Sequence, residues 1–400
     1  MEDPPDNIVQ GDLQDQKTAG YQSPLGVTRD HSVTFRRVQI QSGFTFDQVE
    51  VAYQMLGTLS ARRDNAVLVC HALSGSAHMA GLHAETGRPG WWDYHVGPGK
   101  AIDTDKYYVI CSNVLGGCDG TTGPPSRRPE TGKPYGMSFP FVSIRDMVTV
   151  QAKLVEHLGI SRLFAVIGGS MGGMQALAWA VHFPEQVRVC VPIATCIFHN
   201  AMQIAFNEIG RRAIITDPNW NSGNYAPDRR PKHGLAVARM VGHVTYLSEY
   251  AMTRKFGRTL QPRIDPAAAE AALFTVESYL HHQGDSFVSR FDPNSYLRLT
   301  KALDQFDLFE GQPPEEVLRR VKARFLVISF ASDWLYPPAQ SRALVRWLKR
   351  CRVAATYINL ETLYGHDSFL IENPAFDQVV RHYLEHEHLN ADSNGIRDGV

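Results

Sequence analysis

The chain has 400 residues, and its 40 lysines and arginines almost balance its 41 aspartates and glutamates, leaving a formal net charge of −1. This balance argues against binding to nucleic acid or to an anionic membrane, and no apolar run reaches the roughly 18–20 residues of a membrane-spanning helix. The N-terminal residues are acidic and polar, unlike a secretory signal, and none of the six cysteines forms a CxxC pair. We therefore expect a cytoplasmic protein with no nucleic-acid partner, no membrane contact and no metal site.

The chain begins with a polar segment followed by strand-like sequence. Residues 1–30 are rich in Asp, Gln and Pro and are predicted to form a mobile tail. Residues 33–56 alternate between apolar and polar side chains around a Ser-Gly pair, which is typical of a β-hairpin. Residues 66–71 and 107–111 are continuous apolar runs, as expected for buried parallel strands.

Strands and helices then alternate. Residues 143–157 have helical spacing of apolar side chains, with Ser143 as the N-cap. Residues 163–169 form another buried-strand run, 171–182 a helix, and 187–194 the next strand. This β-α alternation predicts a mostly parallel sheet covered by helices on both faces.

The alternation of predicted strands and helices stops after residue 195. Residues 196–319 contain helical stretches and polar loops but no buried-strand run, which predicts an inserted helical lid. The apolar run 323–330 restarts the sheet. We therefore assign residues 31–195 and 320–400 to one α/β core, in agreement with a length that fits one large domain with an insertion.

The strongest local motif is GGSMG at residues 168–172, which fits G-x-S-x-G between a predicted strand and a predicted helix. This context is that of a nucleophile elbow, in which a sharp turn exposes the serine, here Ser170, at the helix N-terminus. A phosphate-binding loop is the alternative, but the chain contains no GxxxxGK[ST] pattern. The motif predicts an α/β-hydrolase fold.

A serine nucleophile needs a base and an acid, which follow it in this fold in the order Ser, Asp/Glu, His. Asp333 comes just after the strand that ends at residue 330, and His366 follows the strand near residues 357–360. Strand ends of this kind carry the sites of α/β sheets. We expect the backbone amides of Met171 and Leu73 to form the oxyanion hole.

Long motifs in the chain resemble the homoserine O-acetyltransferase family, the acyl-CoA:homoserine acyltransferase branch of the α/β-hydrolase superfamily. They include HALSGSAH (71–78), FPFVSIRDMV (139–148), GGSMGGMQALAWA (168–180), AFNEIGRRAI (205–214), GLAVARMVGHVTYLS (234–248) and YGHDSFL (364–370). The resemblance implies transfer of an acetyl group from acetyl-CoA to the side-chain hydroxyl of L-homoserine through an acyl-enzyme on Ser170, in methionine biosynthesis. It also implies a homodimer formed through the lid helices and no bound cofactor, since acetyl-CoA is a co-substrate.

Two substrate-binding residues follow from the same resemblance. Arg239, in GLAVARM, matches the arginine that holds the substrate carboxylate, and Asp367, beside His366, is expected to pair with the substrate amino group. A guanidinium suits bidentate carboxylate binding. The segments TTGPPSRRP (121–129) and TCIFHNAMQ (195–203) depart from the expected pattern, which bears on the acyl donor and the pocket entrance.

Three other functions stay open on the sequence. The first is the same chemistry with succinyl-CoA as donor or L-serine as acceptor, because a few pocket side chains decide between small groups. The second is an esterase or thioesterase that uses water as the acceptor. The third is a binding module without catalysis, which the presence of all three triad candidates disfavours.

Overall fold

The computed structural model describes residues 21–261 and 273–395, and its centre is one eight-stranded sheet. The strand order is β12-β11-β10-β9-β4-β8-β3-β2, with parallel pairing from β12 to β8 and antiparallel pairing of β3 with β8 and with β2. The strands are β2 (His31–Gln39), β3 (Thr45–Leu56), β4 (Ala66–Cys70), β8 (Tyr108–Ser112), β9 (Leu163–Gly169), β10 (Val187–Ile193), β11 (Arg324–Phe330) and β12 (Ala355–Leu360). The predicted α/β-hydrolase class is confirmed.

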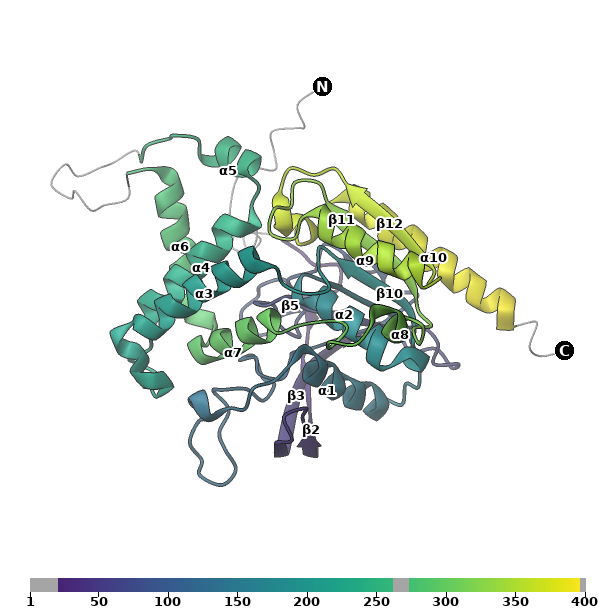
Figure 1. Cartoon of the computed structure of the whole chain (residues 1–400), viewed down its shortest axis with the longest axis horizontal. Coiled ribbons are helices and arrows are strands. Elements are labelled where there is room, and N and C mark those ends of the chain that lie inside the picture. The colour runs from purple at the N-terminus through teal and green to yellow at the C-terminus, as the bar shows by residue number, and fades with distance from the viewer. Residues whose placement is uncertain (1–20, 262–272, 396–400) are drawn as a thin grey trace.

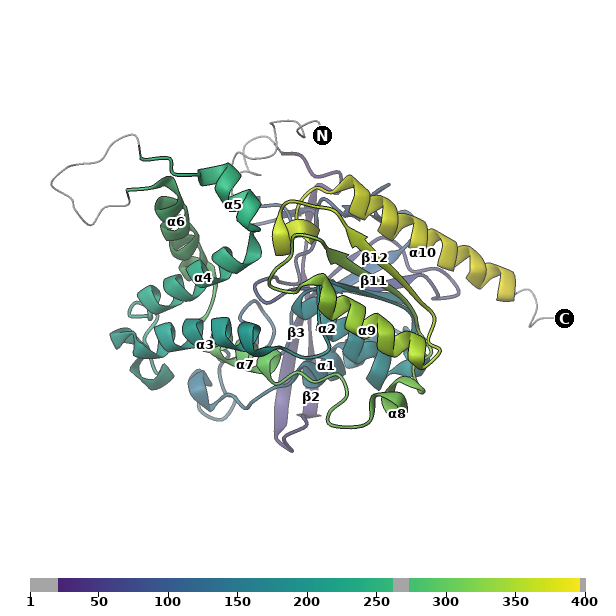
Figure 2. The ribbon, with the colours of Figure 1, turned by 45° about the horizontal axis from the view of Figure 1, so that its top comes forward.

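Helices cover both faces of this sheet (Figures 1 and 2). The two apolar clusters explain why: in β4, Leu68 and Cys70 pack on one side and Val67 and Val69 on the other. The first side is covered by α1 (Ile144–His157), α2 (Met171–His182) and α9 (Pro338–Arg350), and the second by α10 (Pro374–Gly395). Burial on both faces is the reason that these strands read as continuous apolar runs.

The first helix illustrates how local sequence sets an element's start. The Ser143 side chain accepts a hydrogen bond from the Asp146 amide, and the Asp146 carboxylate accepts one from the Ser143 amide, which forms a capping box. The predicted N-cap is therefore confirmed.

Between β10 and β11 the described chain is helical and adds no strand to the main sheet. Five helices there form a group to one side of the sheet in Figures 1 and 2, with α3 packed on α4 and α7, and α4 packed on α6. They are α3 (Ala201–Thr216), α4 (Lys232–Tyr246), α5 (Glu249–Phe256), α6 (Thr275–Arg290) and α7 (Pro293–Asp304), followed by the short α8 (Pro314–Leu318). We call α3–α7 the inserted helices.

Short elements complete the fold. Two two-stranded pairings join β1 (Val27–Thr28) to β5 (Leu82–His83) and β6 (Val96–Gly97) to β7 (Ile102–Asp103). The 3₁₀ helices are η3 (Gly136–Ser138), η4 (Pro184–Gln186), η5 (Pro218–Gly223) and η6 (Gly365–Phe369). Among the described helices, none combines the length and the apolar character needed to span a bilayer.

The structure places the end of the predicted N-terminal tail earlier than residue 30. Residues 1–20 of the predicted mobile tail lie outside the described residues, but the chain is anchored from Tyr21 onward. The hydroxyls of Tyr21 and Ser23 both donate to the fully buried Asp93, the latter at 2.9 Å, and Val27 pairs with Leu82. The end of the predicted tail at residue 30 was therefore too late, because hydrogen bonds to a buried carboxylate compensate for ordering this polar segment.

Candidate active site

Ser170 occupies a strained turn between β9 and α2. Its backbone has φ 58° and ψ −122°, a conformation that costs a non-glycine residue roughly 1–3 kcal/mol. Two hydrogen bonds to the end of β10 and the residues after it hold this turn: the Ser170 amide donates to the Ile193 carbonyl at 2.9 Å, and the Thr195 hydroxyl donates to the Ser170 carbonyl at 2.8 Å. The geometry is that of the predicted elbow.

Glycines around Ser170 make this turn possible. A Cβ on Gly172 would lie 2.0 Å from the carbonyl oxygen of Cys70, and one on Gly168 would lie 2.5 Å from the Gly172 carbonyl carbon. Both contacts are far below van der Waals distance and involve backbone, which cannot rotate away. The first turn of α2 therefore lies directly against the end of β4, where the loop with the predicted oxyanion donor begins.

Asp333 and His366 are brought together at the ends of β11 and β12. His366 Nδ1 lies 2.7 Å from Asp333 Oδ2, and the two residues are 3% and 2% exposed. The other carboxylate oxygen accepts from the Tyr336 amide at 2.8 Å, and the Tyr336 ring stacks on the His366 ring with centroids 4.9 Å apart. A carboxylate on Nδ1 leaves Nε2 as the acceptor in the neutral ring, as a general base requires.

The loop after β4 is held in place by His71. The Val114 amide donates to His71 Nε2 at 3.1 Å, so the neutral ring donates from Nδ1 to the Ala72 carbonyl at 2.7 Å. Burial lowers the pKa of His71, in agreement with this neutral form. Met171 directly follows the serine and begins α2, and Leu73, next in the loop, lies on the same cavity as Ser170, as the predicted oxyanion role requires.

One cavity of about 530 Å³ joins these groups to the inserted helices. Ser170, His366, Asp367 and Arg239 all line it, and Arg239 comes from α4. The arrangement places a cation and a carboxylate in the same cavity as the serine and the histidine. Opposite charges of this kind match a zwitterionic α-amino acid.

Aromatic rings and one hydroxyl position Arg239, which is 8% exposed. Its guanidinium lies 4.7 Å from the centre of the Phe287 ring and 5.6 Å from that of Tyr246, and Nη1 donates to the Ser74 hydroxyl at 3.3 Å. Its buried Nε has no hydrogen-bond partner among the described residues. A cation fixed in this way retains donors for a ligand.

Asp367 and His243 have shifted pKa values in this cavity. Burial raises the pKa of Asp367, while His366 and Arg239 act in the opposite direction. Burial, together with Arg239 and Arg290, lowers the pKa of His243 to about 2, so this histidine stays neutral. A carboxylate of this kind gains most from a ligand that brings a positive charge.

The lining of the cavity carries more basic than acidic side chains. Among the described residues of the lining, five side chains are basic and three are acidic. The basic ones are Arg88, Arg239, Arg254, Lys255 and Arg290, and the acidic ones are Glu85, Asp119 and Asp367. This excess favours an anionic ligand.

Sequence reasoning missed Tyr336, Tyr246 and His199. Tyr336 and Tyr246 face the His366 ring, with centroids 4.9 and 6.2 Å away, and His199 Nε2 lies 2.7 Å from the Tyr336 hydroxyl. The only available signal for Tyr336 is its position three residues after Asp333. No local pattern identifies the other two, because tertiary packing of the inserted helices brings them to the site.

The geometry agrees with what the chain resembles. A family model described as alpha/beta hydrolase fold matches residues 65–371. A homoserine O-acetyltransferase of Methanohalobium evestigatum is 53% identical over 90% of this chain and 75% of its own length. One of Leptospira biflexa is 50% identical over 91% of this chain and 95% of its own length.

Solved structures with similar folds carry two kinds of name. A homoserine O-acetyltransferase from Bacillus anthracis has a TM-score of 0.84 and 30% identity, covering 90% of this chain and 98% of its own. Esterase E22 has a TM-score of 0.82 and 32% identity, covering 89% of this chain and 100% of its own. Structural similarity alone therefore does not separate acyl transfer from ester hydrolysis, whereas the relatives with 50% identity or more are named for transfer.

Proposed function

Because the chain belongs to the homoserine O-acetyltransferases, within the α/β-hydrolase fold family, we propose that it moves the acetyl group of acetyl-CoA to the side-chain hydroxyl of L-homoserine, a step of methionine biosynthesis. The observation that carries this proposal is the shared cavity: Ser170 and His366 lie in it together with Arg239 and Asp367. A serine hydrolase needs only the first pair. The second pair supplies the two charges that an amino-acid acceptor requires.

In the first half-reaction, Ser170 Oγ attacks the thioester carbonyl of acetyl-CoA. His366 accepts the serine proton and passes it to the departing CoA sulfur, while Asp333, 2.7 Å from Nδ1, stabilises the imidazolium. The amides of Met171 and Leu73 stabilise the oxyanion. The products are free CoA and an acetyl ester on Ser170.

In the second half-reaction, homoserine replaces CoA. Its carboxylate binds Arg239, and its ammonium binds Asp367, which directs the side-chain hydroxyl toward the ester on Ser170. His366 takes the hydroxyl proton and returns it to Ser170 Oγ as the acetyl group moves to homoserine. The scheme needs no metal or bound cofactor, because acetyl-CoA is consumed.

The positive charge of the cavity supports CoA as the carrier of the acyl group. CoA carries several phosphate charges, and the cations Arg88, Arg254, Lys255 and Arg290 line the cavity.

Two observations support a cytoplasmic location. Acetyl-CoA is a cytoplasmic metabolite, and all six cysteines are free thiols.

The decisive experiment offers acetyl-CoA or succinyl-CoA with homoserine or serine, and follows CoA release and product mass. We expect O-acetylhomoserine, parallel double-reciprocal plots, and an acetyl adduct on Ser170 when acetyl-CoA is supplied alone. Ser170→Ala should lose both adduct and turnover. A preference for succinyl-CoA or serine would change the substrate assignment, and an adduct on a cysteine would contradict the mechanism.

Ester hydrolysis is the second candidate, favoured by the similarity to esterase E22. It shares the first half-reaction and uses water in the second. Release of acetate at the same rate with and without homoserine would identify the chain as a hydrolase. An increase in CoA release on addition of homoserine would identify it as a transferase.

We also propose that two copies associate through the inserted helices. Six apolar side chains on or beside α3 and α4 are between 38% and 58% exposed in the single chain: Phe198, Met202, Ile204, Ile209, Val237 and Val244. Exposed apolar side chains on two helices that pack together indicate an interaction surface. The double variant Ile209→Asp/Val237→Asp should sediment as a monomer, while Leu389→Asp, on the exposed part of α10, should leave the dimer intact. A monomeric wild type would refute the proposal.

A further inference from the structure

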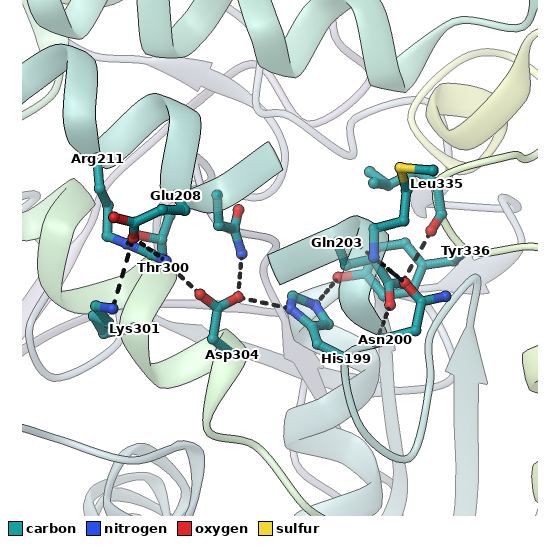
Figure 3. A network of polar contacts seen from close by, with 12 residues as sticks. His199, Asn200, Gln203, Glu208, Arg211, Thr300, Lys301, Asp304, Leu335 and Tyr336 are labelled. Atoms are coloured by element: carbon teal, nitrogen blue, oxygen red, sulfur yellow. Dashed lines mark hydrogen bonds and ion pairs between the residues drawn. The ribbon is translucent and has the colours of Figure 1, made fainter. Parts of the chain in front are cut away.

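Another histidine–carboxylate pair lies outside the cavity lining and contacts Tyr336. His199 Nδ1 is 3.1 Å from Asp304 Oδ1, and His199 Nε2 is 2.7 Å from the Tyr336 hydroxyl (Figure 3). His199 and Tyr336 are 7% and 3% exposed. The row therefore joins α7, which ends at Asp304, to the segment that carries Asp333.

The carboxylate end of this row is ionised. Burial acts to raise the pKa of Asp304, but hydrogen bonds from His199 and Asn207, with the charge of Arg211, lower it overall. Asn207 donates at 2.7 Å, and an Arg211 nitrogen lies 2.6 Å from Asp304 Oδ2. An ionised carboxylate only accepts hydrogen bonds. His199 must therefore donate from Nδ1.

In the neutral ring this sets the direction of the remaining hydrogen bond. When Nδ1 of a neutral imidazole carries the proton, Nε2 is an acceptor. The Tyr336 hydroxyl therefore donates to His199, and burial raises the pKa of Tyr336 well above its usual value, which keeps that proton in place. Only the lone pairs of the Tyr336 oxygen are left for other partners.

Tyr336 contacts every member of the candidate triad. Its ring stacks on His366, its amide donates to Asp333, and its hydroxyl makes a polar contact with Ser170 that acts to lower the tyrosine pKa. The orientation of one hydroxyl hydrogen therefore matters directly at the nucleophile. A hydroxyl that donated to Ser170 Oγ would occupy a lone pair needed for attack on the acyl carbon.

We propose that His199, held by Asp304, is a positioning residue that keeps the Tyr336 proton directed away from Ser170 and so preserves the nucleophilicity of the serine. The proposal rests on Ser170 being the acylated residue, as in the proposed function. Without the His199 acceptor, the Tyr336 proton can turn toward Ser170 Oγ, with which the hydroxyl already makes a polar contact. A neutral hydrogen bond from the Tyr336 hydroxyl to Ser170 Oγ should slow the acylation of Ser170 by roughly 3- to 10-fold.

The test follows acylation of Ser170 by p-nitrophenyl acetate in a stopped-flow burst. In this step the Ser170–acetyl bond forms, the bond to the nitrophenolate breaks, and the serine proton passes to His366. His199→Asn keeps an amide donor for Asp304 but has no group that reaches Tyr336, and should slow the burst by the stated factor. His199→Gln can place its amide oxygen near the former Nε2 and should recover most of the rate.

A double-mutant cycle separates positioning from stability. In a Tyr336→Phe background, where no hydroxyl remains, His199→Asn should have no further effect on the burst rate. His199→Leu, which also lacks the acceptor, replaces His199→Asn in the cycle if that variant does not fold. The matched control is His95→Asn: His95 is buried and its Nδ1 lies 2.6 Å from Asp377, but among the described residues no hydrogen bond links it to Ser170.

The outcomes are distinct. Equal slowing by His199→Asn in both backgrounds, slowing by His95→Asn, or a wild-type burst in His199→Asn would overturn the proposal. Absence of any Ser170 adduct in the wild type would refute the acyl-enzyme and this inference together. A normal burst without transfer to homoserine would refute only the proposed acceptor.

Discussion

Replacement of Arg239 by alanine tests the acceptor site most directly. The side chain is almost fully buried between Phe287 and Tyr246 and donates to the Ser74 hydroxyl at 3.3 Å. Its removal costs the folded protein little polar bonding, but leaves a homoserine carboxylate without its cation. Arg239 also acts to lower the pKa of Asp367, so its loss weakens the ammonium site as well.

The size of the effect follows from burial. Truncating one partner of a buried, hydrogen-bonded charge pair costs roughly 2–5 kcal/mol. At 1.4 kcal/mol per tenfold, the homoserine kcat/KM should fall by roughly 30- to several-thousand-fold. Arg239→Lys should restore only part of this loss, because an ammonium cannot reproduce the two parallel bonds of a guanidinium.

The assay combines a homoserine titration at saturating acetyl-CoA with a burst measurement of Ser170 acylation. Arg290→Ala is the matched control, because Arg290 lies 5.1 Å from the same Phe287 ring and donates to the Ser74 carbonyl at 3.1 Å. It should raise KM for acetyl-CoA rather than for homoserine. If Arg239→Ala abolishes the burst while homoserine KM stays unchanged, Arg239 serves the oxyanion loop through Ser74, and the assignment is wrong.

Three other perturbations have defined outcomes. Homoserine KM should rise on acidification, starting above the usual aspartate pKa, because protonation of Asp367 removes the anion that binds the ammonium; Asp367→Asn should show a high KM without this pH dependence, and an unaltered pH profile would exclude the role. Asp304→Ala should lower the free energy of unfolding by about 3 kcal/mol, measured in urea, because the buried Arg211 loses the more buried of its two carboxylate partners and keeps only Glu208. Since the pKa of Asp304 is lowered in the folded state, this difference is present at neutral pH and should shrink as pH falls below 3.8; a constant difference would contradict it. Gly172→Ala should prevent folding or cost several kcal/mol, because its Cβ would meet the Cys70 carbonyl, and a loss below roughly 0.5 kcal/mol in urea would refute that steric reasoning.

The regular core was predictable because its physical signals are local. The runs at β9 and β11 contain enough apolar side chains to be buried on both faces, and the Ser143 cap fixes the start of α1. The end of the N-terminal tail was not predictable in this way. The Tyr21 hydroxyl bonds to Asp93, which is distant in the sequence, and no residue near Tyr21 indicates that it contacts a buried carboxylate.

The residues of the candidate site also fall into two groups, those that local sequence predicts and those that depend on tertiary packing. Ser170, Asp333 and His366 stand at ends of strands, where chain order and fold class restrict the candidates, and the structure brings the last two to 2.7 Å. Arg239 could be named only through resemblance to a family. Its helix approaches the core through packing among the inserted helices, which no spacing rule specifies.

The buried imidazole of His199 has a partner on each ring nitrogen. It lies in residues 195–203, the segment at which the sequence departs from the pattern of the family it resembles. Placing an imidazole there requires a partner for each ring nitrogen, because a buried unpaired nitrogen is costly. Asp304 and Tyr336 supply both, from two segments that are unrelated in sequence. A histidine exposed on the surface would need neither partner. The two contacts of His199 therefore connect residues 195–203 to the candidate site, and the proposed route from His199 to Ser170 is the Tyr336 hydroxyl.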